Sequence, residues 1–381
     1  MLTPLKIKIV FCGGGTGGHI MPIVAIAREL KRLDKNNRLE IHYIGPKDRG
    51  AFEIFHQDNI KTHVIVSGKI RRYFSLLNII DIFFSIPFGL LQSFFILLFI
   101  NAKLVFSKGG TGSLVVALAA KYLGIPVFLH ESDSVPGLSN RKVSLWAKKI
   151  FISFPITDFF NPKKTIFVGN PIRKDLFQLT VEREDGVAMF NLTYENPVLL
   201  VIGGSQGAKD LNEFILLSLN KLLKSYEIIH IAGPKNYARI SIQSKFLVDP
   251  SLRRHYHLYG SMDENVMKNA YKISDIIISR SGSSSIFEIA ASGKPSILIP
   301  LPTSAGNHQS KNAYQYEKTG AAITIEQNNL SENLFIQEIR NLILRGKEIK
   351  ASALKFAKLD AAEKIAKEIL NYLTIKGAIE K

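Results

Sequence analysis

Four glycine- or serine-rich turns, each placed directly after a β-rich run, form the clearest chemical pattern in this chain. They span residues 13–19, 109–113, 203–208 and 281–285. A glycine after a strand lets the backbone approach a ligand closely, and the helix that follows offers N–H groups and a partial positive charge. A tight turn without a ligand is the alternative for any one of them. Four such turns in one chain favour phosphate and sugar chemistry.

The first turn has the glycine spacing of a dinucleotide-binding fold, with Gly13, Gly15 and Gly18. A nicotinamide cofactor also requires an acidic residue at the end of the second strand. The second β-rich run, residues 41–44, ends instead in Gly45-Pro46. A nicotinamide cofactor is therefore disfavoured.

The last turn leads into a helical pattern that contains Glu288. Backbone N–H groups near Ser283 and Ser284 would suit the sugar or diphosphate of a donor, and the Glu288 carboxylate could accept both hydroxyls of a ribose. A solvated helix residue is the alternative for Glu288. Farther along, residues 307–313 carry amides that could bind sugar hydroxyls or could simply begin a polar helix.

Strands and helices alternate in both halves of the chain and must position these turns. The β-rich runs are residues 6–11, 41–44, 63–66, 104–106 and 127–129 in the first half, and 198–202, 228–231, 276–279 and 296–299 in the second. Helical patterns at residues 22–33 and 212–223 follow the first glycine turn of each half. This alternation predicts parallel sheets made of βαβ units. The sequence therefore predicts an α/β fold with two Rossmann-like domains facing across a cleft.

The domain boundary is predicted at Gly169-Asn170-Pro171, because proline stops the preceding strand and Gly-Asn favours a turn. The predicted domains span residues 1–171 and 172–358. Residues 359–373 have the pattern of an amphipathic helix, which we expect to pack back onto the first domain.

Composition limits the class of protein further. The chain has 381 residues, of which 46% are hydrophobic and 21% charged, so a large core is expected and general disorder is excluded. The net charge of +17 favours anionic partners: lipid, nucleic acid or phosphorylated substrates. The single cysteine, Cys12, excludes a disulfide scaffold and a cysteine-rich zinc site. The N-terminal apolar run is too short for a signal peptide, so no export signal is expected.

Residues 79–100 are long and apolar enough to resemble a membrane span, since 16 of these 22 residues are Ile, Leu or Phe. A span would place strands of one predicted sheet on opposite sides of the bilayer, which argues against it. Two alternatives remain open. The segment is either an apolar patch edged by Lys69, Arg71, Arg72 and Lys103 that dips into anionic lipid, or a buried pair of core helices.

Seven motifs occur here in the order and spacing of the MurG family: GGGTGGH, SKGGTGS, HESDSVPGLSN, GNPIR, GGSQGA, SRSGSSSIFE and NHQSKNA. The match runs from about residue 6 to residue 313, and by these motifs the chain resembles that family. The resemblance implies a GT-B fold and transfer of GlcNAc from UDP-GlcNAc to lipid I (undecaprenyl-pyrophosphoryl-MurNAc-pentapeptide), which gives lipid II in peptidoglycan synthesis. It also implies a peripheral protein on the cytoplasmic face of the plasma membrane.

The resemblance implies specific binding positions as well. Those for UDP-GlcNAc are Thr16, Gly17, Gly18, Asp133, Asn140, Arg173, Ser205, Met262, Ser283, Ser284, Ser285, Ile286, Phe287, Glu288 and Gln309. Many relatives read HEQN where this chain has His130-Glu131-Ser132-Asp133, so Asp133 replaces an amide thought to touch the donor sugar. Asn307 stands where Asp is common. Met262 is a candidate contact to uracil, with ordinary packing as the alternative.

The implied reaction is an inverting displacement at the anomeric carbon, which needs a base for the attacking 4-hydroxyl and groups that stabilise departing UDP. His19 is the first candidate for the base, because the dipole of its helix keeps the ring neutral. A role limited to hydrogen bonding is the alternative. Glu131 is the second candidate, either as the base or as the group that orients His19. Arg173 and Ser205 would meet the leaving diphosphate.

No Asp-x-Asp triplet occurs in the sequence, so neither a bridging metal nor any other cofactor is expected. The acceptor pyrophosphate is expected on two turns of the first domain, at Gly14, Gly15, Gly110, Thr111, Gly112 and Ser113. The net charge would then draw the protein to an anionic membrane surface. A UDP-GlcNAc epimerase and a basic nucleic-acid- or lipid-binding module are the rival functions. The scattered Lys and Arg argue against nucleic acid as a partner.

Overall fold

The computed structural model describes residues 6–14, 17–68, 81–110, 112–155, 159–178, 183–193, 195–204, 208–375 and 377. The chain forms two compact units. Unit 1 comprises Met1–Arg173 together with Leu359–Lys381, and unit 2 comprises Lys174–Lys358.

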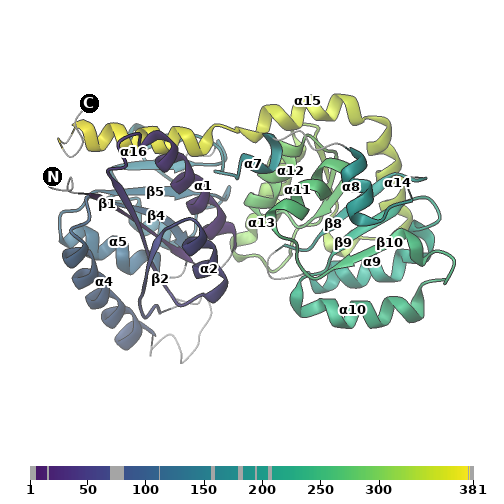
Figure 1. Cartoon of the computed structure of the whole chain (residues 1–381), viewed down its shortest axis with the longest axis horizontal. Helices are drawn as coiled ribbons and strands as arrows, with labels where there is room; N and C mark the ends of the chain where they lie inside the picture. Colours follow the sequence, from purple (N-terminus) through teal and green to yellow (C-terminus); the bar gives the residue numbers. More distant parts are fainter. Residues whose placement is uncertain are drawn as a thin grey trace. The chain divides into compact units, whose positions relative to one another are not determined.

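Unit 1 contains a parallel sheet of seven strands in the order β3-β2-β1-β4-β5-β6-β7. Strands β1, β2, β4 and β5 of this sheet are labelled in Figure 1. The strands are β1 (Ile7–Gly14), β2 (Leu39–Gly45), β3 (Lys61–Val64), β4 (Leu104–Gly110), β5 (Val127–Glu131), β6 (Lys149–Ile152) and β7 (Thr165–Phe167). The chain order reverses at β1, which pairs with both β2 and β4. In a parallel sheet, ligand-binding turns gather at the carboxyl edge beside such a reversal.

Helices cover both faces of this sheet. They are α1 (Gly17–Leu33), α2 (Arg49–Gln57), α4 (Ile86–Ile100), α5 (Ser113–Tyr122), α6 (Leu138–Val143) and α16 (Ala361–Ile375), with short turns η1 (Asp81–Ser85) and η2 (Pro162–Lys164). Along β1, Ile9 and Phe11 face a core formed with α1, α2 and α16. Val10 and Cys12 face a second core formed with α4, α5 and α6. Successive side chains of a strand point to opposite faces of the sheet, so this buried strand contributes alternate residues to two cores.

Helix α1 begins at Gly17, five positions before the predicted start at Pro22, which lies inside the helix. Proline lacks an N–H, so it removes only the hydrogen bond to the residue four positions earlier. That residue is Gly18, in the first turn, and the helix therefore tolerates it. The consequence is that His19 lies in the first turn of α1.

Unit 2 contains a parallel sheet of six strands in the order β10-β9-β8-β11-β12-β13. The strands are β8 (Val198–Ile202), β9 (Glu227–Ile231), β10 (Tyr256–Tyr259), β11 (Ile276–Ser279), β12 (Ser296–Leu298) and β13 (Ala322–Thr324). The helices are α7 (Asp175–Gln178), α8 (Arg183–Phe190), α9 (Lys209–Leu222), α10 (Pro234–Leu247), α11 (Glu264–Ile273), α12 (Ser283–Ser292), α13 (His308–Glu317), α14 (Glu332–Leu344) and α15 (Gly346–Ala357), with short turns η3 (Arg253–His255), η4 (Ala305–Asn307) and η5 (Gln327–Asn329).

Helix α4 is half exposed. Gly89, Ser93, Leu97 and Ile100 are buried, and a Cβ at position 89 would lie 2.1 Å from the Val66 carbonyl oxygen. The opposite face is apolar and exposed at Phe83, Phe84, Phe88, Leu91, Phe95, Leu98 and Phe99. A fully buried helix pair is therefore wrong for the part of this segment that the structure describes. Lys69, Arg71 and Arg72 lie outside the described residues.

One described stretch, Phe83–Ile100, is long and apolar enough to cross a membrane, judged by length and composition alone. It joins β3 to β4, and both strands belong to the same sheet, in which β1 pairs directly with β4. A single crossing would break this sheet, since a strand cannot pair across a bilayer.

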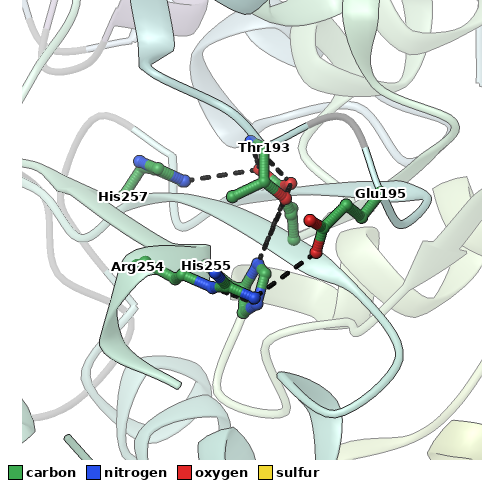
Figure 2. Close-up of polar contacts among 6 residues, drawn as sticks. Thr193, Glu195, Arg254, His255 and His257 are labelled. Atoms are coloured by element: carbon green, nitrogen blue, oxygen red, sulfur yellow. Dashed lines mark hydrogen bonds and ion pairs between the residues drawn. The ribbon is translucent and has the colours of Figure 1, made fainter. Parts of the chain in front are cut away.

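A buried carboxylate stabilises the amino end of the unit 2 sheet. Glu227 is fully buried at the start of β9 and accepts hydrogen bonds from Thr193 N, at 2.8 Å, and from Thr193 Oγ1. Nδ1 of His255 lies 3.8 Å from Glu227 Oε1 and 3.5 Å from the Thr193 hydroxyl, and Nε2 of His257 lies 3.6 Å from Glu227 Oε2 (Figure 2). Glu227 thereby ties the segment before β8 to the edge strand β10.

Candidate functional site

The turns after β1 and β4 meet at the carboxyl edge of the unit 1 sheet. Gly14 pairs in register with Gly110. Gly110 has φ +80°, and a Cβ there would lie only 2.2 Å from the Gly14 carbonyl oxygen. The Ser113 hydroxyl donates to the Gly110 carbonyl at 2.9 Å. Only glycine fits position 110, because both the backbone conformation and the space exclude a side chain.

The imidazole of His19 lies against this pair of turns. A Cβ at Gly110 would be 3.2 Å from both Cε1 and Nε2 of His19. His19 is partly buried in the first turn of α1, where the helix dipole disfavours a positive charge. The structure thus places His19 beside Gly14 and Gly110, two of the residues predicted for the acceptor pyrophosphate.

Glu131 ends β5 and is buried, with 4% of its surface exposed. Its Oε1 accepts from the backbone N–H of Asp133 at 2.9 Å. Its Oε2 accepts from the backbone N–H of Gly137 at 3.1 Å and from Nδ2 of Asn140 at 2.8 Å. Burial raises the pKa of Glu131, and the nearby Asp133 carboxylate raises it further. Three donors on one carboxylate fix the turn from residue 131 to residue 140.

Asn140 connects this turn to the glycines after β4. A Cβ at Gly109, which has φ +86°, would lie 2.6 Å from Oδ1 of Asn140. The same Oδ1 is buried and has no hydrogen-bond partner within the part of the chain that the structure describes. The two predicted residues Glu131 and Asn140 therefore share one network beside Gly109 and Gly110.

His130 points into the core. Its Nε2 lies 3.2 Å from the Gly169 carbonyl oxygen and 3.2 Å from the Ser153 hydroxyl. Burial holds the pKa of His130 well below its usual range, and the positive charge of Lys108 adds to the effect. A neutral histidine in this position links β5 to the end of unit 1.

In unit 2, α12 begins at Ser283, directly after the turn that follows β11. The first turn of a helix carries backbone N–H groups without intrahelical acceptors. Glu288 lies one and a half turns farther along, partly exposed, and its Oε2 accepts from the Tyr271 hydroxyl at 3.2 Å. Tyr271 is nearly fully buried on α11 and is aligned by packing against Phe177. Glu288 is therefore held by a neighbouring helix.

Gln309 is anchored beside the same turn. Its Oε1 accepts from the Leu301 N–H at 3.0 Å, and its carbonyl accepts from the Ser281 hydroxyl at 2.9 Å. Asn312 Nδ2 reaches the Ser281 carbonyl at 3.4 Å. The predicted 307–313 segment and the 281–285 turn are thus one connected structure at the carboxyl edge of the sheet.

The remaining predicted residues differ in placement. Ile286 and Phe287 have fully buried side chains, and Phe287 packs on Phe356 with ring centroids 4.8 Å apart, so only their backbones could face a ligand. Met262 is partly exposed between β10 and α11. Asp133, Arg173, Gly17, Gly18, Ser284 and Ser285 are also partly exposed, and Gly112 and Ser283 are buried. Gly15, Thr16, Thr111 and Ser205 lie outside the described residues.

Comparisons with known proteins identify the family. The model described as "Glycosyltransferase family 28 N-terminal domain" matches residues 9–152, and the corresponding C-terminal domain matches residues 198–369. A Clostridium kluyveri protein, named UDP-N-acetylglucosamine--N-acetylmuramyl-(pentapeptide) pyrophosphoryl-undecaprenol N-acetylglucosamine transferase, is 37% identical over 96% of this chain and 99% of its own. The chain belongs to the MurG family of glycosyltransferases.

Other MurG-family relatives agree. A Bacillus cereus protein, named as transferase 2 of the same kind, is 34% identical over 95% of this chain and 99% of its own. The crystal structure of Acinetobacter baumannii MurG superposes with a TM-score of 0.71 at 23% identity, covering 96% of this chain and 100% of that one. A UDP-GlcNAc 2-epimerase from Neisseria meningitidis gives 0.66 at 16% identity, covering 96% and 100%. At these identities the structures show the fold alone, and that fold is GT-B.

Two buried cations of this MurG-family chain were missed by sequence reasoning. Arg280 donates to the carbonyls of Ile299 and Pro300, each at 3.1 Å, and to Gln327 Oε1 at 2.7 Å. These three hydrogen bonds fix the chain directly before the 281–285 turn. Lys108 is 1% exposed and donates to the Ser132 hydroxyl. Each immediately precedes a turn that was identified, in SRSGSS and SKGGTG. The available signal was a cation between a β-rich run and the turn that follows it, where the chain is expected to be buried.

Proposed function

We propose that this chain transfers GlcNAc from UDP-GlcNAc to the 4-hydroxyl of the MurNAc sugar of lipid I, giving lipid II. The observation that carries the proposal is 37% identity over nearly the whole length of a transferase with that named activity. Its reaction class follows from the family, whose two domain models cover both units.

We assign the donor to unit 2. The amides at the start of α12, around Ser283, Ser284 and Ser285, would hold the diphosphate or sugar, because backbone N–H groups and the helix dipole stabilise anions. The Glu288 carboxylate would accept from the two ribose hydroxyls, with Tyr271 fixing its orientation. Gln309, Met262 and the backbone of residues 286–287 complete the proposed donor contacts.

We assign the acceptor to unit 1. The glycine turns at Gly14 and Gly110 would hold the pyrophosphate, because glycine turns that follow parallel strands let the backbone approach a phosphate closely. At the neighbouring turn lie Asp133 and Asn140, whose buried Oδ1 has no partner within the described residues, and the family resemblance implies that both contact the donor sugar.

His19 is the base in this proposal. Its ring takes the proton of the attacking 4-hydroxyl, the oxygen forms a bond to the anomeric carbon, and the bond to UDP breaks with inversion. The charge that develops on UDP is met by Arg173, by Ser205 and by the helix amides of unit 2. Glu131 acts through its three hydrogen bonds, which hold the 131–140 turn, so we assign it an orienting role.

The exposed apolar face of α4 is the proposed contact with the membrane that carries lipid I. It presents seven large apolar side chains in one helix and its preceding turn. The net charge of +17 would strengthen binding to anionic lipid. The protein would then be peripheral, on the face of the membrane where lipid I is made available.

The experiment supplies purified protein with radiolabelled UDP-GlcNAc and a short-chain lipid I analogue. We expect label in a product that contains both sugars, together with one UDP per transfer. A parallel reaction without lipid tests for the 2-epimer of the donor sugar. Formation of that epimer with no transfer in the first reaction would overturn the proposal in favour of an epimerase.

Variants then separate the two substrates. Glu288→Ala is expected to weaken UDP-GlcNAc binding, measured by calorimetry. His19→Ala is expected to lower kcat by about 10²–10⁴-fold, the usual contribution of a general base, with donor affinity kept. Undiminished turnover in His19→Ala would remove His19 from the role of base.

A further inference from the structure

Lys108 is a buried lysine at the carboxyl end of β4. Only 1% of its surface is exposed, and its ammonium donates a hydrogen bond to the Ser132 hydroxyl. A lysine is almost never buried unless a partner compensates its charge, since removing an ammonium from water costs several kcal/mol. The compensating groups therefore indicate what the lysine does.

The groups that compensate Lys108 are the carboxylates on either side of Ser132. Burial lowers the pKa of Lys108 to about 8, and the attraction of the Glu131 and Asp133 carboxylates for the ammonium opposes that shift. Glu131 is itself buried, and the Asp133 carboxylate repels its negative charge. Two carboxylates two residues apart, one of them buried, thus share one buried cation.

Lys108 also precedes the two glycines that touch the other site residues. Position 109 faces the Asn140 amide, and position 110 faces the His19 ring. Asn140 in turn donates to Glu131. Lys108 therefore fixes the β5 turn to the β4 turn at the point where the β4 turn approaches His19.

We propose that Lys108 is a positioning residue for the transfer reaction, whose ammonium supplies the positive charge that the buried Glu131–Asp133 pair requires and locks the two turns in register. This inference rests on the proposed roles of Glu131 and His19. Lys108 acts through Ser132 and the carboxylates, and it does not reach the substrate from its buried position.

Removing the ammonium has a specific electrostatic consequence. In Lys108→Met, Glu131 keeps its burial and its repulsion from Asp133 but loses the attraction of the Lys108 ammonium, so its pKa rises. The two nearby histidines do not replace the positive charge of Lys108. Burial keeps His130 neutral, and the dipole of α1 disfavours a positive charge on His19 in its first turn. The acidic limb of the kcat/KM profile is expected to move to higher pH, since loss of an attracting positive charge favours the neutral form of a carboxyl group.

Four variants test the proposal: Lys108→Met, Lys108→Arg, Asp133→Asn and the double variant Lys108→Met/Asp133→Asn. The readouts are the pH profile of GlcNAc transfer, donor affinity by calorimetry and thermal unfolding. We expect Lys108→Met to shift the acidic limb upward and to lose about tenfold in kcat/KM at pH 7, with donor affinity unchanged. The double variant removes the repelling Asp133 carboxylate together with the Lys108 cation. The acidic limb of its pH profile should therefore return toward that of the parent protein.

Lys149→Met is the matched control. Lys149 also lies on the unit 1 sheet and pairs with Glu368, but it is partly exposed and distant in sequence from the glycine turns. Its removal should leave the acidic limb in place. Lys108→Arg, which keeps the charge, should shift the limb less than Lys108→Met.

The outcomes separate this inference from the proposed function. If the parent protein transfers GlcNAc and Lys108→Met lowers only the thermal midpoint, Lys108 is merely structural and the inference is wrong. If Lys108→Met does not fold, the double variant decides the question. A double variant that folds and has the acidic limb of the parent protein supports charge compensation. A double variant that does not fold, or whose acidic limb is shifted, overturns the inference. Absence of transfer by the parent protein would instead refute the proposed function.

Discussion

Replacing Gly110 by alanine should disable the candidate acceptor site by displacing two neighbours at once. The new Cβ would lie 2.2 Å from the Gly14 carbonyl oxygen and 3.2 Å from two atoms of the His19 ring. Ordinary van der Waals contact begins at about 3.4 Å, so the β1 turn must retreat by about 1 Å. The residue would also retain φ near +80°, which disfavours any L side chain.

Two separate costs follow from this geometry. Holding alanine at a positive φ costs about 1–3 kcal/mol. For a unit of this size, each kcal/mol lowers the Tm by about 2–4 °C. Displacement of a catalytic group by about 1 Å costs on the order of 10²-fold in rate. We therefore expect Gly110→Ala to fold with a lowered Tm and to lose about 10²-fold in kcat.

Gly124→Ala is the matched control for the backbone cost. Gly124 has φ +69° in the same unit, between α5 and β5, and a Cβ there would meet nothing within 4 Å. It should lower the Tm by an amount similar to the strain part of Gly110→Ala and leave kcat unchanged. Thermal unfolding and the transfer assay are run on both variants under the same conditions.

The reasoning would be refuted if Gly110→Ala and Gly124→Ala had equal kcat. Equal rates would mean that the contacts with Gly14 and His19 do not matter for transfer. A Gly110→Ala variant with parental Tm would also contradict the strain argument.

Three further predictions concern stability and membrane binding. Glu227→Ala should lower the free energy of unfolding, measured in urea, by about 2–4 kcal/mol, because Thr193 loses its buried acceptor. As a control, Glu195→Ala removes an exposed carboxylate and should change the free energy of unfolding by less than about 0.5 kcal/mol. Burial lowers the pKa of His230 to about 3, so the unfolded chain binds a proton below about pH 6.5 that the folded chain refuses. The contribution of His230 to the free energy of unfolding should therefore be complete above pH 6.5 and fall by up to about 1.4 kcal/mol per pH unit between pH 6.5 and 3. The stability of His230→Gln should depend less steeply on pH in this range, and a slope equal to that of the parent protein would contradict the prediction. Phe99→Asp should weaken sedimentation with anionic vesicles at least tenfold and leave transfer to a soluble acceptor analogue intact, while Asp at Leu344, equally exposed in unit 2, should alter neither.

Much of the fold follows from local patterns. Each of the nine predicted β-rich runs overlaps a strand, although the run at residues 63–66 extends past the end of β3, and β6, β7, β10 and β13 were not predicted. Runs that are buried on both faces, such as β8 and β11, need no partner information to be recognised. The glycine turns were also predictable, since a positive φ and close approach demand glycine at Gly109 and Gly110. The start of α1 was misplaced, because proline was read as a boundary although it is tolerated in the early turns.

The sequence by itself determined two alternating α/β halves, the turns at their strand ends, and a motif order that identifies the family. Only the tertiary structure decided which side chains meet. It placed the Tyr271 hydroxyl on Glu288 and the Lys108 ammonium on the Ser132 hydroxyl. It also left one face of α4 exposed. These contacts join residues on separate elements, and local propensity carries no information about which distant segment will fill a given space.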